Sequence, residues 1–131
     1  MIHEDPLRPL HIGLALTLIW LAVVLALPGE TFTTGRAYAG MAAVATEQTW
    51  SVLLAVAGLL GLAGMRDMTC GEVCGMPLRW HLLCLAVLAL VHLWLAFLVF
   101  VANPFGFGTP LFGVLGTLGI CLLWHRVSHA R

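Results

Sequence analysis

Histidine is the residue type in this sequence best suited to binding a metal ion or carrying a proton. His11, His81 and His125 lie near the ends of three hydrophobic segments, which are expected to bring them to one depth of a helical bundle. Imidazoles at one level can ligate a metal such as zinc, and two of them can ligate a haem. Alternatively, the rings lie at these boundaries because a histidine, like a tryptophan, has an apolar body and a polar tip. We expect no cofactor, with haem or zinc as the alternative.

His92 differs from the other histidines because it lies near the middle of the hydrophobic segment 78–102. No other segment offers a histidine at that depth, so a haem there would lack a second axial ligand. A neutral ring that is hydrogen-bonded to a neighbouring helix, through Thr17 or Ser51, is the expected state. With Thr117, these are the few polar side chains at membrane depth, and an ionisable one is a functional candidate.

Soft metal ligands gather around the start of the same segment. Cys70, Cys74, His81 and Cys84 follow the spacing C-x3-C-x6-H-x2-C. A paired C-x2-C pattern would indicate zinc, and this spacing does not match it. Cys84 is expected inside the segment, where a thiol usually packs as a small apolar side chain. We therefore expect these cysteines to be structural, with a metal or redox site as the alternative.

Acidic side chains are confined to the expected loops and tails. They are Glu4, Asp5, Glu30, Glu47, Asp67 and Glu72. The sequence has no G-x-S-x-G, no H-E-x-x-H and no glycine-rich phosphate loop. Intramembrane proteases, proton pumps and voltage sensors need charged or nucleophilic residues at depth. We therefore expect that the protein is not an enzyme.

The amino-acid composition indicates whether water or lipid surrounds the protein. Of 131 residues, 61% are hydrophobic and 9% are charged, and the mean hydropathy is +1.02. Soluble domains are about 45–50% apolar and about 25% charged. The surplus apolar surface needs a lipid bilayer, because one soluble core of this size cannot bury it. A net charge of zero argues against nucleic acid as a partner.

Long apolar runs predict an all-α, four-helix membrane bundle that forms a single transmembrane domain over residues 1–131. The expected spans are 10–27, 49–65, 78–102 and 109–124. Their lengths suit a hydrocarbon layer of about 30 Å at 1.5 Å per residue. Helices are required because a lipid-facing backbone must satisfy its own hydrogen bonds.

Arginines predict the orientation of these spans. With four spans, five of the six arginines fall on one side and only Arg36 on the other. Arginine-rich short loops stay in the cytoplasm, so both termini and the loop after the second span are expected there. The opposite loop, 29–48, contains a stretch, 36–45, that favours a short helix on the membrane surface, with Thr33 or Thr34 as its cap. A plain ordered connector is the alternative.

Small residues provide the clearest packing signal. Three glycines recur at every third position in the second span and again in the fourth, and Ala57 adds a small-xxx-small pair with Gly61. The glycines are Gly58, Gly61, Gly64, Gly113, Gly116 and Gly119. Such strips allow another helix to approach closely. They indicate packing within the bundle or, alternatively, a seam between copies of the chain.

Loop sequences resemble a known group of proteins. The stretches LALPGETF (25–32), AYAGMAAVATEQTW (37–50) and ANPFGFGTPLF (102–112) are similar to small four-helix membrane proteins of tailed phages and prophages. That resemblance implies a multi-pass protein of the bacterial cytoplasmic (inner) membrane with a holin-like or unassigned function.

Three function classes are consistent with these features. The first is a self-associating membrane protein of the holin or small-pore kind, whose partners are the lipid bilayer and itself. The second is an accessory or anchor subunit of a larger membrane complex, holding haem or quinone near the cytoplasmic face. The third is a small-molecule transporter or channel that uses His92. Size, scarce charge and the glycine strips favour the first.

Overall fold

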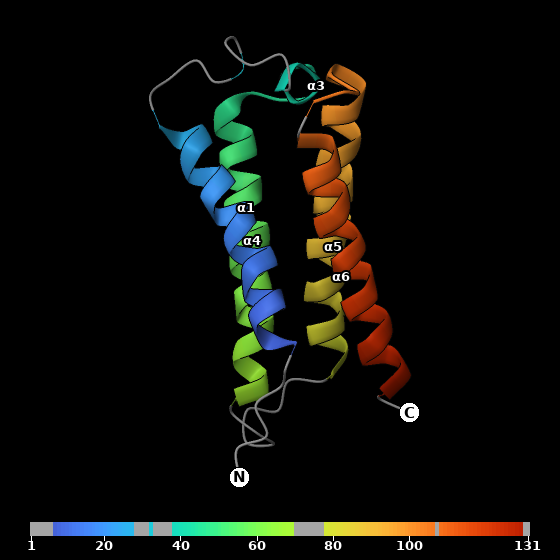
Figure 1. Ribbon diagram of the computed structural model, residues 1–131. Coiled ribbons are helices and arrows are strands. Elements are labelled where there is room, and N and C mark those ends of the chain that lie inside the picture. Colours follow the sequence, from blue (N-terminus) through green and yellow to red (C-terminus); the bar gives the residue numbers. More distant parts are fainter. Residues whose placement is uncertain (1–6, 28–31, 33–37, 70–77, 107, 130–131) are drawn as a thin grey trace.

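The computed structural model describes residues 7–27, 32, 38–69, 78–106 and 108–129, and these are folded into helices joined by short connections (Figure 1). With the labels of Figure 1, the helices are α1 (Arg8–Ala26), α3 (Ala39–Ala42), α4 (Glu47–Thr69), α5 (Leu78–Ala102) and α6 (Gly108–His129). Four of them are long and apolar enough to cross a membrane: Arg8–Ala26, Glu47–Met65, Trp80–Ala102 and Gly108–Ser128. The prediction of an all-helical protein with four such helices is confirmed for the described residues.

Local sequence explains where these helices begin and end. The first turn of α1 tolerates Pro9, because its missing N–H would have no helical partner there. Leu27 ends α1 in an extended conformation (φ −67°, ψ 143°), which is the conformation favoured before a proline. At the start of α4, the hydroxyl oxygen of Thr46 accepts a hydrogen bond from the backbone N–H of Thr49 at 3.3 Å, and the acidic Glu47 occupies the first turn.

The helices pair into two antiparallel hairpins. One hairpin consists of α1 and α4, the other of α5 and α6, and the two meet mainly through α4 and α5 (Figure 1). The start of α1, the end of α4, the start of α5 and the end of α6 all lie at one end of the bundle. At the opposite end, α3 packs against α5. Elements from both hairpins therefore meet at each end.

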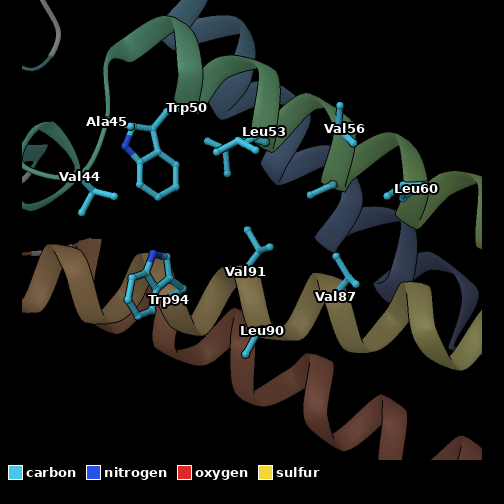
Figure 2. Close-up of a pocket in the computed structure, with 12 residues that line it drawn as sticks. Val44, Ala45, Trp50, Leu53, Val56, Leu60, Val87, Leu90, Val91 and Trp94 are labelled. Atoms are coloured by element: carbon cyan, nitrogen blue, oxygen red, sulfur yellow. The ribbon is translucent and has the colours of Figure 1, made fainter.

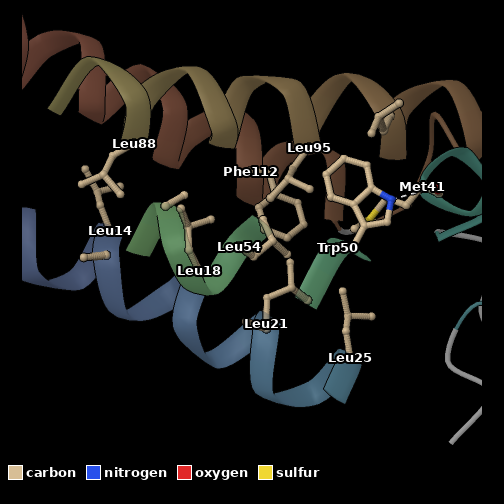
Figure 3. Packing of buried hydrophobic residues seen from close by; sticks show 14 of the residues in the cluster. Leu14, Leu18, Leu21, Leu25, Met41, Trp50, Leu54, Leu88, Leu95 and Phe112 are labelled. Carbon is tan, nitrogen blue, oxygen red and sulfur yellow. Dashed lines mark hydrogen bonds between the residues drawn. The ribbon is translucent and has the colours of Figure 1, made fainter. Parts of the chain in front are cut away.

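Leucines from both hairpins form the core between them (Figure 3). Leu14 and Leu18 of α1, Leu54 of α4 and Leu88 and Leu95 of α5 are fully buried. Two side-chain hydrogen bonds join helices beside this apolar core, and both donors are on α4. The Ser51 hydroxyl donates to the carbonyl of Ala22 in α1 at 2.8 Å, and the Trp50 indole donates to the carbonyl of Met41 in α3 at 2.9 Å.

Helix α3 lies within the stretch 36–45 for which the sequence favoured a short helix. Met41 is fully buried and Gly40 lies against the backbone of Leu98, whereas Ala39 and Ala42 are exposed. The predicted caps, Thr33 and Thr34, lie outside the described residues.

Candidate functional site

Two of the predicted histidines meet in the interior. His11 of α1 and His81 of α5 are only 4% and 5% exposed, and their ring centroids lie 5.3 Å apart at an interplanar angle of 43°. Each is the fourth residue of its helix, which places the pair near the end of the bundle where the chain enters α1 and α5. Sequence reasoning placed both rings at one depth, and packing brings them into contact.

Helix α4 lies against both rings. The carbonyl of Gly64 accepts a hydrogen bond from His81 Nδ1 at 2.9 Å. The backbone of Gly61 lies beside the ring of His11. Nε2 of each ring is buried without a hydrogen-bond partner. Three different helices, α1, α4 and α5, therefore form the surroundings of the pair.

His125 does not join the pair. It is exposed on α6, and no group of three or more histidine, cysteine or acidic side chains with the geometry of a metal site occurs within the described residues. Cys70 and Cys74 lie outside the described residues. Cys84 is buried in α5 beside Gly64, consistent with the packing role expected of it.

His92 is fully buried, but its predicted hydrogen-bond partner was wrong. Its Nδ1 bonds the carbonyl of Leu88, one turn back in its own helix, at 2.8 Å. Thr17 instead donates to its own helix at Gly13, and Ser51 donates to Ala22. Side chains on helices often bond the carbonyl four residues earlier, which removes the need for a partner on another helix.

Most of the glycines serve packing within the chain. A Cβ at Gly58 would lie 2.9 Å from the carbonyl oxygen of Ala15 in α1, and one at Gly119 would lie 2.8 Å from Cβ of Ala89 in α5. Three further positions are closed by single side chains. Gly61, Gly64 and Gly116 face Leu88, Cys84 and Leu93 of α5. The strip of α4 therefore packs against α1 and α5, and the strip of α6 packs against α5.

Gly113 is the exception, because nothing lies within 4 Å of the Cβ it would carry. It shares a shallow groove of about 380 Å³ on α6 with Thr117, which is exposed and donates to the Gly113 carbonyl at 2.9 Å. The other lining residues are Pro110, Val114 and Leu118. Gly113 and Thr117 are four residues apart and form a small-xxx-small pair. The pair can be read from the sequence, where the regular glycine strip is the stronger signal.

A second groove, of about 470 Å³, lies between α4 and α5 (Figure 2). Trp50 and Trp94 stand at one end of it, on opposite helices, and aliphatic side chains such as Leu53, Val87 and Val91 line the rest. Nothing in the sequence pointed to this groove, because its lining residues follow no spacing that sets them apart from the other apolar residues of α4 and α5.

Comparisons with known proteins found no matching family model, no similar curated protein and no similar solved structure.

Proposed function

We propose that this protein self-associates in the membrane through the outer face of α6, and that it is of the small-pore or holin-like kind. The observation that carries the proposal is the outward-facing pair Gly113 and Thr117 beside the α6 groove. Small residues on a lipid-facing surface contribute little packing against acyl chains, whereas they let a second helix approach closely. Of the four spans, α6 is also the least buried within the chain.

A pore of this kind needs several copies of the chain. The core between the hairpins is filled by leucines, and His92, the ionisable side chain at mid-depth, is fully buried. Four-helix bundles pack solid, so one copy offers no aqueous path. A lumen would instead lie between protomers in a ring. Thr117 is the one predicted mid-depth polar residue exposed on a side that neighbouring protomers would share.

Gly113→Leu tests the seam. We expect the wild-type protein to be oligomeric in mild detergent by native mass spectrometry, and the variant to shift to monomer because a leucine blocks close approach. Gly13→Leu is the matched control: its Cβ also has nothing within 4 Å, but it lies on α1. The control should keep the wild-type oligomer.

Two results would count against the proposal. One is a wild-type protein that is strictly monomeric and causes neither growth arrest nor dye leakage on induced expression. The other is an oligomer that Gly113→Leu and Gly13→Leu leave equally intact, since the seam would then lie elsewhere.

Orientation is part of the proposal: both termini in the cytoplasm of a bacterial cell, with α3 at the outer interface. The arginine distribution supports it, as does the common position of the first residue of α1 and the last turn of α6 at one end of the bundle. In cells carrying Cys84→Ala and Cys121→Ala, a membrane-impermeant maleimide should label Gln48→Cys and spare Cys70 and Cys74 until permeabilisation. Labelling of Cys70 or Cys74 in intact cells would reverse the orientation.

An accessory or anchor subunit of a larger complex is the second candidate. The groove between α4 and α5 supports it, because its apolar walls suit a partner helix or the tail of a lipid-soluble ligand such as a quinone. Co-purification with a larger complex, and a haem band in the visible spectrum, are the observations that would favour it over self-association.

A further inference from the structure

The histidine pair contains two buried nitrogen atoms with no hydrogen-bond partner. The carbonyl of Gly64 can only accept a hydrogen bond, so Nδ1 of His81 carries the ring proton. In the neutral ring Nε2 of His81 then holds a lone pair, and no donor reaches it. Nε2 of His11 is buried without a partner as well. Buried polar atoms of this kind call for a bound ion or water.

The tautomer imposed on His81 is one that metal-binding histidines use. A ligating histidine commonly donates its other N–H to a backbone carbonyl, which fixes the ring orientation and leaves the second nitrogen free for the metal. Here Gly64 of α4 provides that carbonyl for His81. The two nitrogens of an imidazole point in widely different directions, so Nε2 of His81 points away from the Gly64 carbonyl.

The separation of the rings distinguishes between possible metal centres. Two imidazoles on a tetrahedral ion, with metal–nitrogen bonds of about 2.0 Å, have ring centroids about 5 Å apart. Two axial ligands on opposite sides of a haem iron would have centroids about 6 Å apart, with the macrocycle between them. The observed separation is 5.3 Å, and the two rings contact each other directly. The geometry therefore fits a single small ion rather than haem.

We propose that His11 and His81 bind one transition-metal ion of the zinc class through their Nε2 atoms. The described residues supply these two ligands and no third, which leaves coordination positions for water or an exchangeable ligand. The site lies near the end of the bundle rather than at mid-depth, which shortens the path that an ion must take from water. It is separate from the outer face of α6, so the two proposals can fail independently.

Titration of the purified full-length protein with Co²⁺ and Zn²⁺ tests the site. Cys70→Ser and Cys74→Ser are introduced first, to remove other soft ligands. We expect one Co²⁺ per chain with the visible absorption of a tetrahedral centre, displaced by Zn²⁺. Loss of an outer-shell partner weakens metal binding about 10–100-fold, so His11→Ala or His81→Ala, which remove a ligand itself, should weaken it by at least about 100-fold.

Two further variants keep the test decisive if an alanine variant unfolds. His81→Cys restores a metal ligand but not the bond to Gly64, and it should bind Co²⁺ with an added thiolate charge-transfer band. His125→Ala removes an exposed histidine and should bind as the background protein does. No binding by the background protein would overturn the proposal. Binding that survives both His11→Ala and His81→Ala would overturn it as well.

Discussion

Gly61→Leu is expected to destabilise the bundle more than any surface substitution, because it forces α4 away from α5. A Cβ at this position would lie 2.6 Å from Cδ1 and 2.9 Å from Cγ of Leu88. Leu88 is 0% exposed, so its side chain is enclosed by its neighbours. Overpacking a core costs about 1–3 kcal/mol and sometimes more. The midpoint of thermal unfolding in detergent, followed by circular dichroism, should fall clearly below that of the wild type.

Two control variants isolate the cause of this effect. Gly13→Leu adds the same side chain at an open position of α1, and Leu59→Ala removes apolar surface from a residue of α4 that is 59% exposed. Both should unfold close to the wild-type temperature. Gly116→Leu should resemble Gly61→Leu, because it meets Leu93 of α5. If both bulky glycine variants keep wild-type stability and oligomeric state, close helix approach is not what these glycines provide.

The two glycine strips show how far the sequence determines packing. Spacing of three residues predicts a face of close approach, and five of the six glycines have that role. Each step of three turns the face by about 60° around the helix. Along α6 the strip therefore drifts about 120°, so that Gly116 and Gly119 face α5 while Gly113 turns outward. Which end of a drifting strip faces inward depends on the neighbouring helix, which periodicity does not reveal.

For the histidines too, the sequence predicts one part of the arrangement and not the other. Hydrophobic segment lengths were enough to predict that His11 and His81 lie at one depth, because both stand on the fourth residue of a helix. Their contact depends on the rotation of α1 and α5 about their axes, and the hydrogen-bond partner of His81 is a backbone carbonyl, which has no side-chain signal in the sequence. His125 was grouped with them by depth alone. It is excluded because its helix presents it outward.

Gly40→Ala is expected to detach α3 from α5, although it adds a single methyl group. The new Cβ would collide with the carbonyl oxygen of Leu98 and lie 3.1 Å from its carbonyl carbon. A backbone group within a helix cannot rotate away as a side chain can, so α3 itself must move. That movement would draw Met41 out of the core and break its carbonyl's hydrogen bond with the Trp50 indole.

The measurement for Gly40→Ala combines stability with a local signal from Trp50. Thermal unfolding should begin earlier, and the contribution of Trp50, obtained by comparison with Trp50→Phe in both backgrounds, should show a more polar indole environment. Gly13→Ala adds the same methyl group where nothing lies within 4 Å. It should be neutral or stabilising by up to about 1 kcal/mol, because alanine favours a helix more than glycine does. Equal behaviour of the two alanine variants would mean that the docking of α3 onto α5 does not constrain residue 40.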